Sequence, residues 1–423
     1  MSGNKVFVKK VLGDGISYEG EMVNGLPEGK GIYHFKEGYF SGEFIGGKYN
    51  GHGKMHYYPV GDEKDDIFDN GDYVEGKLLE GNWKDNKMDG RFVVYQHGIP
   101  YDYEFSMGKE VDPKIYYDIP MPNDEVAPGT IRCLYGGQSC FLVETVNETF
   151  VFDWYRASMP SLRKDKPIYV FISHAHMDHF NRRIFNLVDD FDDVHFYMGM
   201  DIDNEEKEFF EKNFNRIFEK VDDNIEYFVG NEELDTDFGQ VSTLKSTDLG
   251  VAFLVKTKDI TLFHAGDLSL FSAVGSMKKF KRDILDKDPK VDTSSMPEEV
   301  LQKIYENIHD PSGLHIVQFM KERFLNYMSP LSGEKIDYAM IPMDPRFGSY
   351  GIYTSEKYLQ AAKIKNFTPM HFWEQYDFVS EFVKLHPDMG ANMIAVNPKG
   401  DSIKETIEIN KPYIVKVDRN SEK

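Results

Sequence analysis

ISHAHMDH, residues 172–179, is the stretch that decides the expected fold and chemistry, because it holds four potential metal ligands within six residues. It follows an apolar run that predicts a strand and precedes a predicted helix, and side chains at a strand end converge on one point. His174 and His176 lie two residues apart on one face of extended chain, so both imidazoles can reach one ion. Asp178 and His179 follow in the turn and offer an oxygen and a nitrogen to a neighbouring position. The HxHxDH pattern therefore predicts a metal site.

Two further candidate ligands lie downstream. An apolar strand is predicted before AGD, residues 265–267, and another before the histidine of TPMH, residues 368–371. The order HxHxDH, then GD, then a terminal histidine resembles the metallo-β-lactamase superfamily over roughly residues 129–400. The resemblance implies an α/β fold, the αββα sandwich, with the metals at one edge between two sheets. It also implies that Asp267 bridges two metals and that His371 completes the second position.

A second stretch narrows this resemblance. IPMDPR, residues 341–346, followed by the terminal PMH is similar to the lactonase-like branch of the superfamily. That branch includes L-ascorbate-6-phosphate lactonase and, more distantly, N-acylphosphatidylethanolamine phospholipase D. It implies a metal-dependent hydrolase that uses a metal-bound hydroxide on a small ester, lactone or phosphodiester.

One departure from the family pattern concerns the first metal position. Family members usually supply a third histidine on the segment that here reads KSTDL, residues 245–249. Asp248 can substitute as an oxygen ligand beside His174, His176 and Asp267; alternatively, the first metal is weakly held or absent, and Asp248 caps a turn or hydrogen-bonds a ligand. A carboxylate in place of an imidazole shifts preference from zinc toward manganese or iron. We expect one or two divalent ions, with zinc as the first candidate and manganese or iron as alternatives.

The expected catalytic group consists of Asp178, His179 and Asp267. Two ions about 3.5–4 Å apart would hold the nucleophilic hydroxide between them, since coordination lowers the pKa of water toward neutrality. Asp178 would act as a ligand and as the acceptor of the nucleophile's proton, while the metal stabilises the developing oxyanion. We interpret His264 as a core or supporting residue, because side chains three apart on a strand point to opposite faces.

Arg346 and Asp344 are the candidate substrate-binding residues. The planar guanidinium of Arg346 suits a carboxylate or phosphate, and the alternative is an ion pair with Asp344 or another acid. Nearby aromatic residues form either a recognition wall or ordinary packing. These residues are Tyr350, Tyr353, Trp373 and Tyr376.

The first hundred residues are internally repetitive. Tyr18-Glu-Gly20 recurs as Phe40-Ser-Gly42, and the GxG pairs at residues 29–31 and 51–53 keep the same period of about 22 residues. A third, looser copy covers residues 79–92, after an acidic insert at residues 62–72. Aromatic residues that alternate with polar ones between glycines predict short hairpins, which stack into an elongated β-solenoid because one hairpin cannot bury its face alone.

This pattern closely resembles MORN repeats over roughly residues 15–100. The resemblance implies an interaction or scaffold module, in some proteins linked to lipids or to self-association. Two interpretations stay open: a role in assembly or substrate placement, or a passive extension of the fold.

The chain is expected to divide at a Pro-rich stretch. We predict a MORN-like domain at residues 1–111, a linker at 112–128 and a metallo-β-lactamase-like domain at 129–423, with a helical insertion at about 270–335. That insertion is either a lid over the site or a packing helix. The expected helices include residues 181–188, 205–219 and 298–328. The expected strands are residues 139–143, 148–152, 167–172, 194–197, 241–244, 250–256, 261–264 and 338–341.

Composition restricts the partners. The chain has 423 residues and a net charge of −22, which argues against a general electrostatic grip on nucleic acid or on anionic lipid. Only Cys133 and Cys140 occur, which gives no disulfide framework and favours a reducing compartment. No apolar leader and no run of about 18 apolar residues is found, so we expect a cytoplasmic protein with a small-molecule substrate.

Two other functional classes remain open. The protein could be a scaffold or binding protein whose degenerate site keeps a metal for structure, or a di-iron oxygen-using enzyme. The complete ligand series favours an enzyme, because structure alone does not need an open coordination position. No flavin or ferredoxin module is evident to supply electrons, so the oxygen-using enzyme ranks last.

Overall fold

The computed structural model divides the chain into two compact units, Met1–Lys114 and Ile115–Lys423. The boundary falls inside the stretch predicted as a linker. The described residues are 6–58, 77–96, 99–111, 114–199, 221, 224–270, 314–347, 349–373, 375–388, 393–396 and 406–417. In this part of the chain, no helix is both long enough and apolar enough to cross a membrane.

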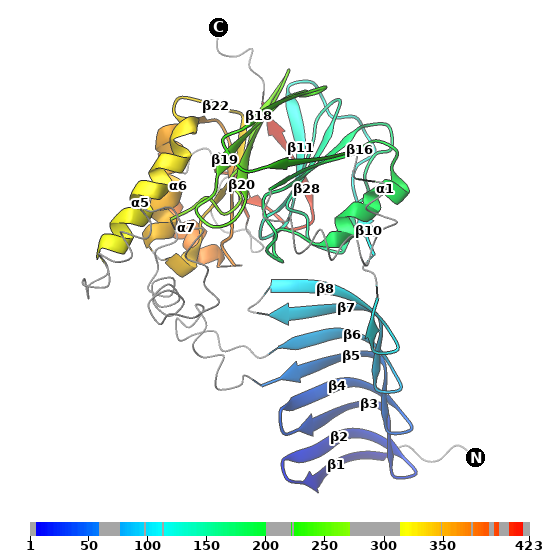
Figure 1. The fold of residues 1–423 in the computed structure, drawn as a ribbon. Helices are drawn as coiled ribbons and strands as arrows, with labels where there is room; N and C mark the ends of the chain where they lie inside the picture. Colours follow the sequence, from blue (N-terminus) through cyan, green and yellow to red (C-terminus); the bar gives the residue numbers. More distant parts are fainter. Residues whose placement is uncertain are drawn as a thin grey trace, which may run out of the picture. The chain divides into compact units, whose positions relative to one another are not determined.

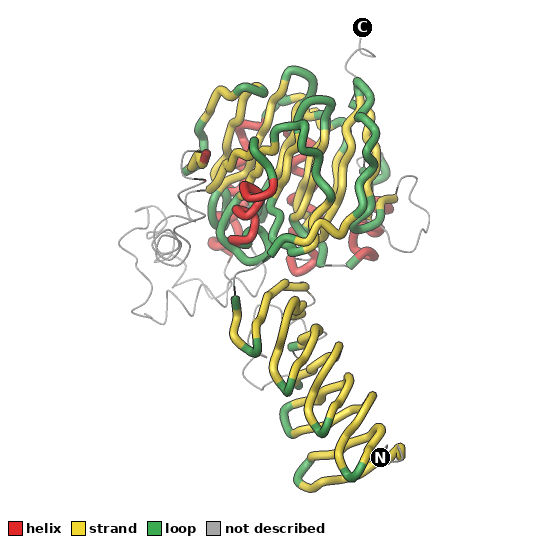
Figure 2. Tube along the Cα trace, turned by 90° about the vertical axis from the view of Figure 1, so that its right-hand side faces the viewer, coloured by secondary structure: helices red, strands yellow, loops and turns green. Residues whose placement is uncertain are grey.

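The described part of the first unit is one nine-stranded antiparallel sheet whose strands follow each other in sequence order. Figure 2 shows the successive hairpins stacked along the sheet. This is the predicted repeat architecture. The strands are β1 (Val6–Gly13), β2 (Ile16–Val23), β3 (Leu26–Phe35), β4 (Gly38–Ile45), β5 (Lys48–Tyr57), β6 (Leu78–Lys84), β7 (Lys87–Gln96), β8 (Ile99–Ser106) and β9 (Lys109–Glu110).

A row of glycines crosses this sheet beneath its aromatic residues. The glycines pair strand by strand from β2 to β6 at positions 20, 31, 42, 53 and 81. A Cβ on Gly42 would lie 2.6 Å from the Phe40 ring, and one on Gly81 would lie 2.6 Å from the Phe92 ring. The buried rings therefore lie flat across neighbouring backbone, which only glycine permits. This packing gives the thin sheet its core, which each hairpin shares with the next.

The second unit is built on two main sheets (Figure 1). In the described residues, the seven-stranded sheet has the order β17-β16-β15-β13-β12-β11-β28 and the six-stranded sheet the order β18-β19-β20-β21-β23-β25. The first comprises β11 (Thr130–Gly137), β12 (Cys140–Glu144), β13 (Thr149–Phe152), β15 (Ile168–Ile172), β16 (Val194–Gly199), β17 (Ile225–Phe228) and β28 (Pro412–Lys416). The second comprises β18 (Glu233–Thr236), β19 (Gly239–Lys245), β20 (Val251–Thr257), β21 (Thr261–His264), β23 (Tyr338–Pro342) and β25 (Phe367–Met370). All eight predicted strands are present.

One apolar core lies between these sheets. The rings of Phe171 and Phe253 meet edge to face at 5.1 Å, and those of Phe150 and Phe238 meet at 5.4 Å. Each pair joins a residue from the β13–β15 region to one from the β18–β20 region, and all four residues are buried in the same cluster. Face-to-face packing of two sheets is therefore established.

Among the described residues, more helices lie beside the six-stranded sheet than beside the seven-stranded one (Figure 1). Helix α5 (Leu314–Met328) contacts β19 and α6 (Ser349–Ala361) contacts β23, while α7 (Tyr376–Leu385) lies beside them. On the other sheet the described helix is α1 (Leu187–Asp190), preceded by a 3-10 turn, η2 (Arg182–Asn186). The helix predicted at residues 205–219 lies outside the described residues, so the described helices alone do not make up the full αββα layering.

Other expectations need correction or lie partly outside the described residues. Part of the predicted linker is a strand, β10 (Tyr116–Ile119), which pairs in parallel with β14 (Ser158–Pro160) and so joins the second unit. Prolines flank this short strand instead of interrupting it. Helix α5 lies within the predicted insertion at about 270–335, and residues 271–313 lie outside the described residues. Short two-stranded sheets complete the fold: β22 (Lys335–Ile336) with β24 (Lys363–Ile364), and β26 (Ala395–Val396) with β27 (Thr406–Ile407).

The topology gathers strand ends at one edge. Strand β13 runs parallel to β15, and β21, β23 and β25 run parallel to one another. The carboxyl ends of parallel strands meet at the same edge of a sheet, and in open sheets ligands bind at that edge. Just beyond these ends come Asp153, His174, Asp267, Asp344 and His371.

The glycine row can be tested by a single methyl group. Gly42→Ala should reduce the free energy of unfolding of the first unit by about 1–3 kcal/mol, because its Cβ would overlap the Phe40 ring and the backbone of Gly53. Denaturant unfolding followed by circular dichroism measures the effect. Ser41→Ala, on the next residue of the same strand, is the matched control and should change little. Equal unfolding midpoints for both variants would show that the rings do not require glycine.

Candidate metal centre

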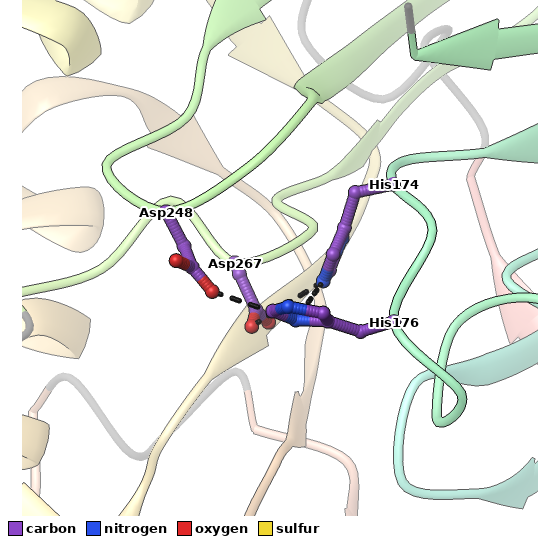
Figure 3. Close-up of side chains that lie close together, drawn as sticks. All are labelled: His174, His176, Asp248 and Asp267. Carbon is purple, nitrogen blue, oxygen red and sulfur yellow. Dashed lines mark hydrogen bonds and ion pairs between the residues drawn. The ribbon is translucent and has the colours of Figure 1, made fainter. Parts of the chain in front are cut away.

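Four of the predicted ligands form one group at the edge of the sheets. His174, His176, Asp248 and Asp267 each offer a ligand atom, and these atoms lie within 4.8 Å of one another. Figure 3 shows the two imidazoles meeting the two carboxylates, which come from two separate loops. Nε2 of His174 lies 3.0 Å from Nδ1 of His176 and 3.7 Å from Oδ2 of Asp267. Asp248, the residue for which the sequence left two roles open, lies in this group, with Oδ2 at 3.5 Å from Nδ1 of His176.

The remaining predicted ligands form a second group that shares Asp267 with the first. Asp178, His179 and His371 come within the same 4.8 Å of one another. Nε2 of His179 lies 2.8 Å from Nε2 of His371, and Oδ1 of Asp267 lies 3.2 and 3.1 Å from these two nitrogens. Asp267 therefore points one oxygen at each group, as a bridging carboxylate does. The structure brings together all seven residues predicted as ligands.

The electrostatics of the cluster favour a cation. Burial lowers the pKa of His174 to about 3, and the neighbouring His179 adds to this effect, so His174 is neutral and able to act as a ligand. Burial also opposes a charge on His179, yet Asp267, Asp178 and Asp153 hold its pKa well above its usual value. Two imidazole nitrogens 2.8 Å apart can share only one proton between them. The donor set fits a positive ion at this point.

Two glycines allow the ligand loops to close on each other. Gly250, in the Asp248 loop, has φ +63°, and Gly266, beside Asp267, has φ +50°. A Cβ on Gly250 would lie 2.7 Å from Cβ of His174, and one on Gly266 would lie 2.8 Å from Cβ of Ser173. Positive φ and close approach therefore both require glycine here.

Thr247 fastens the loop that carries Asp248 to the loop that carries Asp267. Its hydroxyl donates to the carbonyl of Ser269 at 2.5 Å and accepts from the Ser269 amide at 2.9 Å. These contacts hold Asp248 near the other candidate ligands, although it is distant from them in sequence.

Asp153 is a site residue that the sequence analysis missed. It is fully buried at the end of β13, where Oδ2 lies 2.7 Å from Nδ1 of His179. The same carboxylate accepts hydrogen bonds from the amide and the hydroxyl of Ser173, at 2.7 and 2.6 Å. Although burial opposes its ionisation, the neighbouring imidazoles of His264 and His179 hold the pKa of Asp153 below the usual value. The sequence did contain a signal for Asp153, because it is an acid directly after a predicted apolar strand. The structure adds that this strand pairs in parallel with the one that precedes the histidines.

His264 is a supporting residue, as expected. It is fully buried, with Nε2 at 3.1 Å from the carbonyl of Ser139, and Nδ1 accepts from the amide of Gly266 at 3.2 Å. The hydroxyl of Ser139 in turn donates to the carbonyl of Asp178. These contacts connect the β11–β12 turn to the segment before Asp267 and to the turn that carries Asp178.

Arg346 takes the second of its two predicted roles, the ion pair with Asp344. Its Nε lies 2.9 and 2.8 Å from the two carboxylate oxygens, and Nη2 also contacts Oδ2. The guanidinium stacks on the Trp373 ring, with Cζ 4.1 Å from the ring centroid. The charge that a substrate anion would need is thus already balanced by Asp344. The predicted aromatic wall is divided: Trp373 lies here, whereas Tyr350 and Tyr353 face Lys321 on α5.

Residues 18–38, 40–59 and 80–91 match the model of the MORN repeat family. The first unit carries MORN repeats. The three matched stretches fall on the hairpins β2–β3, β4–β5 and β6–β7, which share the glycine row. No curated protein matches the chain significantly in sequence.

Solved structures similar to the chain include metal-dependent hydrolases of the metallo-β-lactamase fold. A metallo hydrolase from Ignicoccus hospitalis is 13% identical, with 67% of this chain and 98% of that chain covered at a TM-score of 0.40. A putative zinc-dependent hydrolase of the metallo-β-lactamase superfamily from Thermotoga maritima is also 13% identical, with 60% and 85% covered at 0.29. The di-iron β-hydroxylase CmlA from Streptomyces venezuelae is 11% identical, with 69% and 55% covered at 0.38.

Asp153→Asn tests the support of His179. If the cluster binds metal, the variant should bind Zn²⁺ about 10–100-fold more weakly, because the histidine loses the carboxylate that orients it. Zn²⁺ titration in competition with a chromophoric chelator measures the affinity. Asp193→Asn, which alters an exposed Asp–His contact of 2.9 Å with His195, is the control and should bind as the parent does. Equal affinities for the two variants would contradict the role assigned to Asp153.

Proposed function

We propose that the second unit is a metal-dependent hydrolase with the αββα metallo-β-lactamase fold. The observation that carries this proposal is the convergence of two imidazole nitrogens and one carboxylate oxygen, from His179, His371 and Asp267, within 3.2 Å of one another. Buried titratable groups are this close when they share a proton or a metal. The first group shares Asp267 with the second and offers donors for a second ion.

Each proposed metal position takes the same types of ligand. His174, His176 and Asp248 would hold one ion, His179, His371 and Asp178 would hold the other, and Asp267 would contribute to both. When bound, the ions supply Lewis acidity and lower the pKa of a coordinated water toward neutrality. Equal numbers of nitrogen and oxygen donors make the first position harder than the three-histidine site of the family, which favours manganese or iron beside zinc.

The protein's own residues define the open side of the centre. His174, His179 and His371 are buried, whereas the His176 side chain is 46% exposed and that of Asp248 is 35% exposed. Substrate would approach from the His176–Asp248 side. Asp178, with Oδ2 3.8 Å from Nε2 of His179 and 3.7 Å from Nε2 of His371, is the acid placed to hold the proton that the attacking water loses.

The proposed substrate is a small ester, lactone or phosphodiester. This class follows from the resemblance of IPMDPR and the terminal PMH to the lactonase-like branch. The ion pair of Arg346 with Asp344 gives no support to a strongly anionic group near these residues. For the MORN repeats we propose a role in assembly or substrate placement, with self-association or a protein partner, in the cytoplasm.

Metal content and turnover test the proposal together. We expect the purified full chain to contain between one and two equivalents of divalent metal and to hydrolyse a generic ester, lactone or phosphodiester. Asp267→Asn should lower kcat/KM by at least about 100-fold, since the amide keeps only one oxygen and so could not serve both ions. Elemental analysis and assays with Zn²⁺, Mn²⁺ or Fe²⁺ added measure both quantities. Asp193→Asn is again the control.

The scaffold alternative predicts a different result. Less than one equivalent of metal and no turnover with any added ion would support a binding protein with a degenerate site. Colour and iron content together with oxygen consumption would support the di-iron alternative. Either outcome would contradict the hydrolase.

Asp248→His tests the metal preference. Restoring the family's imidazole should raise the ratio of Zn²⁺ to Mn²⁺ affinity at the first position by roughly tenfold, about 1.4 kcal/mol. Asp248→Ala should weaken both ions. Competitive titration of the two metals measures the ratio, and an unchanged ratio in Asp248→His would show that Asp248 is not a ligand.

A further inference from the structure

The carboxylate of Asp344 lies among three side chains at the edge of the centre. It is 3% exposed and accepts from both the guanidinium of Arg346 and the indole Nε1 of Trp373, the latter at 3.2 Å. Its Oδ2 also lies 3.8 Å from Nδ1 of His371. The carboxylate thus stands behind a candidate metal ligand, on the side of the imidazole opposite the cluster.

Arg346 holds this carboxylate in place through several independent contacts. Its backbone amide donates to Oδ1 at 2.9 Å and its Nε reaches both oxygens, so the chain turns back on itself around Asp344. Stacking on Trp373 restricts the guanidinium further. A fork with two N–H groups in one plane suits a carboxylate better than the point charge of a lysine does.

The backbone after β25 directs the other two members toward Asp344. His371 has φ +59° and Trp373 has φ +51°, both in the left-handed region that non-glycine residues rarely adopt. The amide of His371 donates to the carbonyl of Gln138 at 3.4 Å, and Phe372 between them is buried against Tyr135. Such strained positions persist where surrounding contacts over-determine them, and they gather at functional sites.

The two ring nitrogens of His371 consequently have different environments. Nε2 faces His179, Asp178 and Asp267, while Nδ1 faces Asp344. A carboxylate 3.8 Å from Nδ1 favours the tautomer that carries its proton on Nδ1, which leaves Nε2 unprotonated and able to bind a metal. Asp153 lies on the corresponding side of His179, at the shorter distance of 2.7 Å from Nδ1. Both histidines of the second group therefore have a buried carboxylate behind them.

We propose that Asp344 and Arg346 are positioning residues of the second metal position and not substrate-binding residues. Asp344 selects the tautomer and orientation of His371, and Arg346 with Trp373 fixes Asp344. The inference rests on the proposed function, because it requires that the cluster binds metal. It assigns the DPR segment, residues 344–346, to the metal centre itself.

The alternative is that the ion pair only fastens the loop after β23. A fastening role predicts a loss of stability in the metal-free chain without a selective effect on one metal position. A positioning role predicts that the second equivalent of metal is weakened and that the first is retained.

The experiment titrates the full chain with Zn²⁺ and, separately, with Co²⁺, whose absorption spectrum reports the ligands. In Asp344→Asn we expect the second equivalent to bind about 10–100-fold more weakly and its Co²⁺ band to change, while the first equivalent binds as in the parent. Arg346→Met should change the second equivalent in the same direction and by less. Asp344→Glu, which keeps the charge, should restore part of the affinity.

Controls separate the possible failures. Asp344→Asn leaves the half-buried charge of Arg346 without its acid, which can destabilise a protein, so the double variant Asp344→Asn/Arg346→Met removes both charges together. Asp193→Asn controls for an unrelated Asp–His contact. Parent protein that binds no metal would overturn the proposed function. Parent protein that binds two equivalents, with unchanged second-equivalent affinity in folded Asp344→Asn or in the double variant, would overturn this inference alone.

Discussion

The convergence of His179, His371 and Asp267 is the constraint on which the second unit depends. Two imidazole nitrogens and a carboxylate oxygen, all buried, approach within 3.2 Å. Burying such groups is costly unless opposite charges and hydrogen bonds compensate. The surrounding acids offset part of this cost, and a bound cation would offset more of it. The loops after β21, β23 and β25 and the turn after β15 are arranged around this point.

Two buried carboxylates lie behind the candidate ligands His179 and His371. Asp153 contacts His179, and Asp344 contacts His371, so each histidine of the second group is held from the side away from the cluster. Their own partners, Ser173 for Asp153 and Arg346 for Asp344, lie on the backbone segments that also carry or flank ligands. The strand ends that supply the candidate ligands therefore also supply the residues that orient them.

The two units bury their apolar side chains in different ways. The second buries apolar rings between two sheets, as in the contact of Phe171 with Phe253. The first has a single sheet, and it gains a core by laying Phe40 and Phe92 across glycines of the neighbouring strands. This difference explains why the first unit repeats and the second does not, since each added hairpin extends the row of rings and glycines.

The HxHxDH stretch, Asp267, His371, the eight strands and the MORN repeats could all be predicted from the chain alone. Spacing within a short segment decides the HxHxDH stretch, the strands and the repeats, whereas Asp267 and His371 were predicted from the order of motifs that the chain shares with a known family. For Asp248 and Arg346 the sequence left two roles open, and the contacts of Asp153 were not predicted. Gly250 and Thr247 bring Asp248 to the cluster, parallel pairing of β13 with β15 brings Asp153, and the turn at Trp373 gives Arg346 its partners. Only the packing of distant strand ends decides such contacts, because local spacing carries no information about which loops meet.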